Sequence, residues 1–134
     1  MIAGMSTTTG RFDLTRWDED TYHDEHGVRL VAVSVAKAFE GGISGTSTAR
    51  LLQALAKEGA AAYVGIEHVS AAVDGRSGTF LLQHCAVASD TGRQLTVEVV
   101  PNSGSGQLAG ISGELTITVS PEGEHTYSFT YELG

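Results

Sequence analysis

Three side chains near the middle of the chain, Tyr63, Glu67 and His84, have the types that proton transfer needs. A carboxylate and an imidazole can share a proton, and a phenol can donate a hydrogen bond to a substrate oxygen. Burial in apolar surroundings is expected to raise the pKa of the Glu67 carboxyl, because desolvation disfavours its charged form. If the fold brings these groups together, they could perform general acid–base chemistry on a small apolar substrate.

A β-hairpin would bring the three residues to one face of a sheet. Asp74-Gly75 is the strongest short signal for a two-residue hairpin turn, and apolar runs flank it on both sides. With that turn, Glu67 faces Leu82, and His84 lies diagonally from Glu67 on the neighbouring strand. Because side chains alternate along a strand, Tyr63, Glu67 and His84 point the same way. We expect this face to line the interior, since it mixes glycine with aromatic residues as a narrow lumen requires.

A purely structural interpretation of these residues stays open. Glu67 would then be paired with His84 or Arg50, and His84 would belong to a buried polar network, because buried charges are usually paired for structural reasons. On the catalytic interpretation, other residues would shape the cavity around a ligand. Those expected to do so are Val69, Phe80, Leu82 and Tyr127, together with Trp17, which is expected in a loop where it either plugs one mouth or packs on the surface.

Other reactive residue types have weaker patterns. The run His23-Asp24-Glu25-His26 contains metal-ligand types, but it lies in an acidic stretch without a second cluster, so we expect a solvated loop and no metal site. Cys85 is expected to be an inert buried thiol, and as the only cysteine it excludes an internal disulfide framework. The glycine-rich stretch Pro101–Gly106 lacks the lysine of a phosphate-binding loop, so we expect no cofactor.

The elements that must position these residues are short strands joined by tight turns. The 134 residues include 17 glycines and two prolines, an excess of glycine that favours turns over long helices. We expect a disordered segment over residues 1–9 and a single domain over residues 10–134. Strands are predicted at Gly10–Arg16, Arg29–Phe39, Ala60–Val73, Ser77–Ala88, Gln94–Val100, Gln107–Val119 and His125–Leu133, with a loop over Trp17–Gly27.

The segment Thr46–Gly59 gives conflicting signals. Local propensity favours a helix, with Leu51, Leu52 and Leu55 in one stripe and Gly59 placed to end it. Its neighbours favour a strand, because Glu58-Gly59 is also a hairpin signal between two apolar runs. If this segment is a strand, the chain has eight strands, enough to close a small barrel and remove the free sheet edges.

Three stretches of the chain have a distinctive pattern. They are Phe39 with Gly42-Ile43-Ser44-Gly45, then Tyr63–Glu67 running into Asp74–His84, and lastly Val100–Gly113, to which Trp17 and Tyr131-Glu132-Leu133 add. Together they resemble the bacterial family known as domain of unknown function 3224, over nearly the whole chain. That family is similar in fold to allene oxide cyclases and plant dirigent proteins. The resemblance implies an all-β, closed eight-stranded antiparallel barrel with little or no helix, in which Thr46–Ala56 is a strand. It implies no catalytic residues.

Composition narrows the choice of partners. Sixteen acidic and eight basic residues give a formal charge of −8, and such a surface repels phosphate backbones, so neither nucleic acid nor an anionic membrane is an expected partner. No apolar run approaches the ~20 residues of a membrane span, and no leader sequence is recognised, so we expect a cytoplasmic protein. By analogy with similar barrels, a homo-oligomer is also expected.

These observations lead to one main hypothesis about function and two alternatives. The main hypothesis is a barrel that holds one small, largely apolar molecule and catalyses a cofactor-free isomerisation or cyclisation of a flexible hydrophobic metabolite. The first alternative is a non-catalytic carrier or sensor that uses the same cavity. The second is a barrel with a filled core that serves self-association, and the volume of the interior distinguishes it from the other two.

Overall fold

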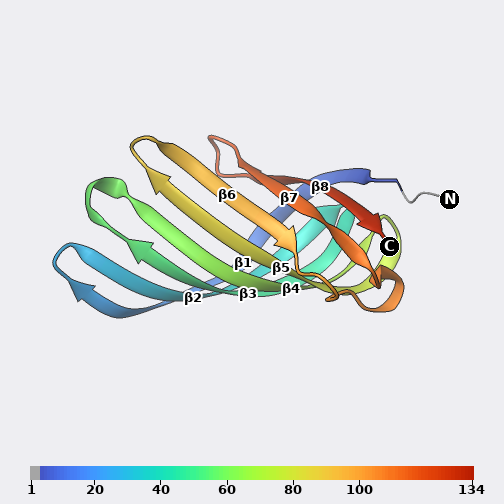
Figure 1. Ribbon diagram of the computed structural model, residues 1–134, viewed down its shortest axis with the longest axis horizontal. Helices are drawn as coiled ribbons and strands as arrows, with labels where there is room; N and C mark the ends of the chain where they lie inside the picture. Colours follow the sequence, from blue (N-terminus) through green and yellow to red (C-terminus); the bar gives the residue numbers. More distant parts are fainter. Residues whose placement is uncertain (1–3) are drawn as a thin grey trace.

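The computed structural model describes residues 4–134, which form a closed barrel of eight antiparallel strands in sequence order (Figure 1). The last strand pairs with the first, so the expected all-β closed barrel is confirmed. The strands are β1 Ser6–Glu25, β2 Val28–Gly41, β3 Ile43–Leu55, β4 Ala61–Val73, β5 Arg76–Ser89, β6 Gly92–Val99, β7 Ile111–Val119 and β8 His125–Leu133. Within residues 4–134, the helical segments are two 3-10 turns, η1 Lys57–Gly59 and η2 Gly106–Leu108, and no helix is long and apolar enough to cross a membrane.

The hairpin of β4 and β5 forms as its turn dipeptide predicts. Asp74 and Gly75 have φ angles of 48° and 87°, the left-handed conformation that a two-residue type I′ turn requires at both positions. The resulting register places Glu67 opposite Leu82. His84 lies two positions further along β5, so its side chain points to the same face as that of Glu67.

Residues 46–55 belong to a strand, although their local sequence favours a helix. β3 pairs with β2 on one side and with β4 on the other along nearly its whole length. This double pairing satisfies its backbone donors and acceptors and places Ser47 and Ala49 in the interior. Tertiary pairing therefore outweighs helix propensity. After the strand ends, η1 forms a single 3-10 turn, within which Glu58 has a left-handed φ of 59°.

β1 is much longer than the sequence predicts. The strand expected at Gly10–Arg16 continues through the expected loop Trp17–Gly27 as far as Glu25, with two β-bulges on the way. The loop prediction was wrong because the polar side chains of this stretch reflect exposure, not a lack of backbone partners. The valine-rich strand β2 pairs with β1 from Gly10 to Glu25 and extends it.

The N-terminal prediction also needs correction. Disorder was expected over residues 1–9, but β1 begins at Ser6 and pairs with β8 from Ser6 onward. Residues 1–3 lie outside the part of the chain that the structure describes. The prediction rested on the small polar side chains of this stretch, whereas its backbone has a partner strand.

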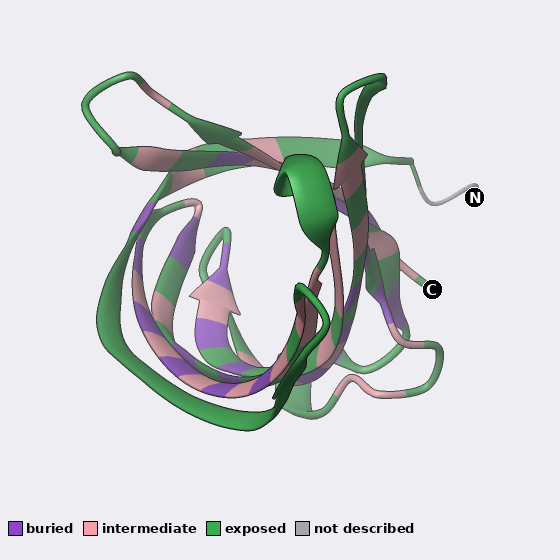
Figure 2. Ribbon diagram, turned by 90° about the vertical axis from the view of Figure 1, so that its left-hand side faces the viewer, coloured by how far each residue is buried: buried purple, intermediate pink, exposed green. Residues whose placement is uncertain are grey.

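The barrel is filled at one end and hollow at the other. The filled end lies beneath the β2–β3 and β4–β5 turns, where Phe80 and Phe129 stack with their ring centroids 5.8 Å apart. Their core includes Phe12, Phe39, Ile43, Val69, Val73, Leu82, Val97, Leu108, Ile111, Leu115, Tyr127 and Tyr131. Toward the hollow end the hairpins β1–β2, β3–β4 and β5–β6 project beyond the core (Figure 1), and Figure 2 looks into this end. The free volume of the interior described here lies on that side.

The wall of the barrel is weakest between β6 and β7. These two strands share a single ladder pair, Glu98 with Glu114, and a depression of about 370 Å³ runs along their junction. The loop between them bonds to β5 instead, where the Ser105 amide donates to the Thr79 carbonyl oxygen at 2.8 Å. The loop thereby places the fully buried Leu108 over the filled end.

Candidate functional site: a half-open cavity with a buried acid–base chain

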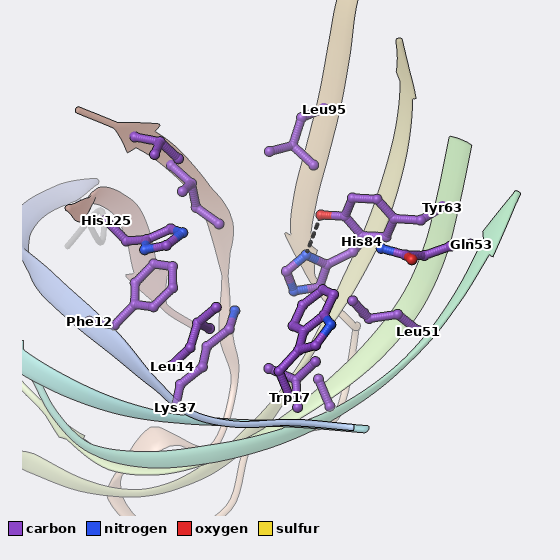
Figure 3. Close-up of a pocket in the computed structure, with 14 residues that line it drawn as sticks. Phe12, Leu14, Trp17, Lys37, Leu51, Gln53, Tyr63, His84, Leu95 and His125 are labelled. Carbon is purple, nitrogen blue, oxygen red and sulfur yellow. Dashed lines mark hydrogen bonds between the residues drawn. The ribbon is translucent and has the colours of Figure 1, made fainter. Parts of the chain in front are cut away.

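The hollow end of the barrel contains a partly open cavity of about 230 Å³ (Figure 3). All eight strands contribute to its largely apolar wall, through Phe12, Leu14, Trp17, Val35, Lys37, Ala49, Leu51, Gln53, Tyr63, His84, Leu95, Ile117, Val119 and His125. An apolar cavity of about 150 Å³ is large enough to bind benzene. The cavity is somewhat larger than that, so this end of the interior is not filled by side chains.

The three predicted acid–base residues lie together on one side of this cavity. Tyr63 Oη is 3.3 Å from His84 Nδ1, the contact that Figure 3 marks with a dashed line. His84 Nε2 is 2.7 Å from Glu67 Oε1. Glu67 is completely buried and His84 nearly so, whereas Tyr63 is half-buried. The groups form a chain that runs from the cavity surface into the barrel wall.

Two residues that the sequence interpretation missed complete the surroundings of Glu67. Lys37 Nζ donates to Glu67 Oε1 at 3.0 Å, and Ser47 Oγ donates to Glu67 Oε2 at 2.6 Å. The Lys37 side chain is only 8% exposed. Arg50, the partner considered from the sequence, is exposed on the outer face instead. The sequence does indicate that Lys37 points inward, because it lies on the same face of β2 as Val35 and the other buried valines.

The Glu67 carboxyl is ionised, which corrects the expected direction of its pKa. Burial alone raises the pKa, but the hydrogen bonds from His84 and Ser47 and the charge of Lys37 outweigh burial and lower it to about 2. The prediction from desolvation was wrong because these donors, from β2, β3 and β5, replace the water that burial removes. A buried, ionised carboxylate is stable here because it is fully hydrogen-bonded.

The ionised carboxylate fixes the position of the proton on His84. Glu67 has no proton to give, so His84 Nε2 must be the donor, and in a neutral imidazole Nδ1 is then an acceptor. Among residues 4–134, the donor within hydrogen-bond distance of Nδ1 is the Tyr63 hydroxyl, at 3.3 Å. Burial, followed by the charge of Glu67, raises the pKa of the Tyr63 phenol, so the phenol keeps its proton at neutral pH. With a neutral imidazole, the chain runs from Tyr63 O–H to His84 and from His84 N–H to Glu67.

Four of the residues expected to shape the ligand's surroundings lie elsewhere. Val69, Phe80, Leu82 and Tyr127 are buried as expected, but they pack in the filled core and do not line this cavity. The Tyr127 hydroxyl is occupied by backbone groups, accepting from the Ile43 amide at 2.8 Å. Alternation along a strand indicates which face points inward, and it gives no height along the barrel axis. Because that height was not predicted, these four residues were expected at the cavity, whereas they lie in the filled core.

Trp17 lies at the mouth of the cavity, although it is in a strand and not in a loop. Its indole Nε1–H donates to Glu19 at 2.8 Å, and the side chain remains 43% exposed. Leu14, Leu95 and Val119 also line the cavity while being exposed. We call Leu14, Trp17, Leu95 and Val119 the apolar rim. Exposed apolar groups gathered around an opening are typical of binding sites.

The other reactive residues considered from the sequence do not enter the cavity. Cys85 is exposed, so its predicted burial was wrong, because the outward face of β5 is uncovered. Over residues 4–134, no three side chains of metal-ligating type lie close enough to hold an ion together.

Comparisons with known proteins agree with the fold. The profile of the family described as "Protein of unknown function (DUF3224)" matches residues 8–131. A crystal structure of a protein with unknown function from that family, from Shewanella oneidensis MR-1, is 34% identical with a TM-score of 0.90, and the match covers 98% of each chain. No protein with a curated description matches the chain. The likeness to allene oxide cyclases and dirigent proteins stays a prediction.

Proposed function

The chain belongs to the DUF3224 family, and since that family's description assigns no activity, we propose a function from the cavity: the barrel binds one small, largely apolar carbonyl compound and isomerises it by proton transfer. The observation that carries this proposal is the Tyr63–His84–Glu67 chain, which begins at the cavity surface and ends on a buried carboxylate.

Binding is supported by the division of the cavity into apolar and polar parts. Most lining residues are apolar, and the apolar rim extends that surface to the mouth. The polar groups on the wall of β2, β4 and β5 include Lys37, Tyr63 and His84. A few convergent polar groups in an apolar pocket fix the orientation of a ligand. A carbonyl oxygen suits this wall, because Lys37 is a donor and the compound's hydrocarbon part would face the remaining strands.

The proton-transfer step follows from the direction of the hydrogen bonds. Tyr63 Oη takes a proton from the carbon beside the ligand's carbonyl, while the phenol's own proton passes to His84 Nδ1. The carbonyl oxygen gains negative charge, which the Lys37 ammonium stabilises, and the imidazolium is stabilised by the Glu67 carboxylate. The reverse transfers deliver the proton to a different carbon of the same ligand and restore the site. The ligand gains and loses one proton, so the product is an isomer.

A non-catalytic carrier or sensor is the second candidate, because the cavity volume and the apolar rim favour binding whether or not a reaction follows. The two candidates differ in what happens to a hydrogen atom of the ligand. On the catalytic proposal, hydrogens beside the carbonyl exchange with solvent at an enzymatic rate. On the carrier proposal, they exchange no faster than in free solution.

The test uses Trp17, the only tryptophan of the chain, to select ligands. Because Trp17 lies on the apolar rim, its fluorescence is expected to change when a small cyclic ketone or enone enters the cavity. Ligands selected from a panel of such compounds are then incubated with the protein in D₂O, and deuterium incorporation beside the carbonyl is followed by NMR. Tyr63→Phe is expected to slow exchange by about 10²–10⁴-fold, with ligand affinity changed only a few-fold.

Tyr22→Phe is the matched control, because Tyr22 is exposed on β1 and lies outside the cavity. It is expected to leave exchange and affinity unchanged. Binding without accelerated exchange in the unmodified protein would refute catalysis of this reaction and favour the carrier. Exchange that survives Tyr63→Phe would show that the proton does not pass through the phenol. A panel from which no compound changes the Trp17 signal would count against both candidates.

A further inference from the structure

The outer wall of the barrel carries an apolar surface that no part of residues 4–134 covers. Leu52 on β3, Val64 and Ile66 on β4, and Val87 on β5 are each between 48% and 56% exposed. They are neighbours, because Leu52 pairs with Val64 and the strands carrying them are adjacent. A shallow depression of about 520 Å³ lies over most of them. We call these four residues the outer patch. Contiguous exposed apolar surface of this kind marks interaction sites.

Two opposite charges flank the outer patch at the same level. Across the ladders, Arg50 pairs with Ile66, Ile66 pairs with Gln83, and Gln83 pairs with Glu98. One row therefore runs over β3, β4, β5 and β6, with a cation at one end and an anion at the other, and both are exposed. The midpoint of the row lies between β4 and β5. A half-turn about that midpoint exchanges the two ends of the row. A second copy placed by this half-turn would therefore set its Glu98 opposite Arg50 and its Arg50 opposite Glu98.

The anionic end of the row lacks a counter-charge within the described chain. Glu98 is directly opposite Glu114 at the β6–β7 junction, and like charges facing each other across strands are destabilising. None of Arg50, Glu98 and Glu114 takes part in an ion pair within residues 4–134. A cation supplied from outside would relieve this repulsion, and Arg50 is a cation on the same face.

We propose that the outer patch binds a second copy of this chain, in a dimer whose two-fold axis runs parallel to the strands between β4 and β5. Rotation about that axis sets β3 against the partner's β6 and β4 against the partner's β5. Arg50 then faces the partner's Glu98 at both ends of the interface, and Val64 faces the partner's Cys85. A surface that is complementary to itself is what a two-fold interface requires.

The curvature of the wall agrees with this arrangement of side chains. The outer wall of the barrel is convex (Figure 2), so the gap between two copies in the proposed dimer would widen with distance from the axis. Near the axis lie the compact side chains Val64 and Ile66, which suit close contact. Further out lie Arg50 and Glu98, whose length allows them to bridge a wider gap. Apolar contact alone would permit several registers between the two copies. Because both copies are acidic overall, the register that pairs each Arg50 with the partner's Glu98 is favoured over the others.

Sedimentation velocity on the full chain tests the dimer. At tens of micromolar, the protein is expected at twice the 14.0 kDa mass of one chain. Arg50→Glu and Glu98→Arg are each expected to weaken the dimer about tenfold or more, because each brings like charges face to face. The double variant Arg50→Glu/Glu98→Arg is expected to recover the original affinity to within about threefold, since the pair is re-formed with its signs exchanged.

Arg76→Glu and Glu122→Arg are the matched controls. They make the same changes in net charge at exposed positions away from the outer patch, at the start of β5 and in the β7–β8 turn, and they are expected to leave the dimer intact. Circular dichroism of each variant verifies that the barrel is folded. A protein that remains monomeric up to about 100 µM, far above the dissociation constant of an ordinary specific dimer, would overturn the proposal. A double variant that stays as weak as the single ones would overturn it as well, because Arg50 would not face the partner's Glu98.

Discussion

Replacing Glu67 by glutamine is expected to remove much of the stability of the folded barrel. The substitution keeps the shape of the side chain and removes its charge. Lys37 would then remain charged with its side chain 8% exposed, and Ser47 and His84 would lose a charged acceptor. Breaking a buried ion pair by removing one partner costs about 3–5 kcal/mol, because the other charge stays in the interior without compensation. That is a large part of the stability of a small domain.

The pKa of Glu67 gives a second route to the same magnitude. The carboxyl titrates at about 2 in the folded protein, against 4.5 for the unperturbed group. Because the folded pKa is the lower one, this contribution is fully present above pH 4.5 and is lost as the pH falls toward 2. The difference corresponds to on the order of 3 kcal/mol at neutral pH. The two routes therefore agree, and the second also predicts a pH window.

Urea denaturation followed by far-UV circular dichroism measures the effect. At pH 7, Glu67→Gln is expected to lower the free energy of unfolding by about 3–5 kcal/mol, and the gap to the unmodified protein should close between about pH 4.5 and pH 2. Glu40→Gln is the control, since the Glu40 side chain is 63% exposed beside Arg11, and about 0.5 kcal/mol or less is expected. Adding Lys37→Met to Glu67→Gln should recover much of the loss.

Two outcomes would refute this reasoning. A Glu67→Gln variant within about 0.5 kcal/mol of the unmodified protein at pH 7 would show that the carboxylate is not stabilised as a charge. A gap that persists unchanged down to pH 2 would show that the loss comes from packing and not from ionisation.

Two further predictions concern the filled end. Phe80→Ala is expected to cost about 3–5 kcal/mol of stability in urea denaturation, because it removes a fully buried ring that stacks on Phe129; a ligand selected with Trp17 should still bind the folded variant, and loss of binding would mean that the core and the cavity are not separate. Tyr127→Phe is expected to cost about 1–3 kcal/mol, since the buried Ile43 amide loses its acceptor, and a change within the error of the same measurement would contradict that role.

Local signals sufficed for the hairpins. The Asp74-Gly75 dipeptide fixes both the turn and its register, and alternation then places Glu67 and His84 on one face without any knowledge of the remaining strands. Which of the two faces points inward was predicted from the residue types on these two strands alone. Segments that carry their own turn chemistry and alternation can therefore be predicted from the sequence.

Other features depend on contacts that no local pattern contains. The second half of β1 is polar, and only its pairing with β2 makes it a strand. The pKa of Glu67 depends on donors from β2, β3 and β5, so the sign of its shift required Lys37 and Ser47 to be found first. Alternation along β2 already indicates that Lys37 points inward. The sequence does not indicate that Lys37 lies close to Glu67, because β2 and β4 are not neighbouring strands.

On the proposed function, the junction of β6 and β7 would set the length of ligand that the barrel can accept. The two strands meet only at Glu98 and Glu114, and beyond that pair they separate toward the hollow end, where Leu95 and Val119 stand on opposite margins of the opening. The mouth thus continues down the side of the molecule as a notch. If the barrel binds a carbonyl compound as proposed, a long hydrocarbon tail could extend sideways through this notch while the carbonyl lies beside Tyr63. The cavity volume of about 230 Å³ would then limit the size of the carbonyl-bearing part of such a ligand, and not the length of its tail.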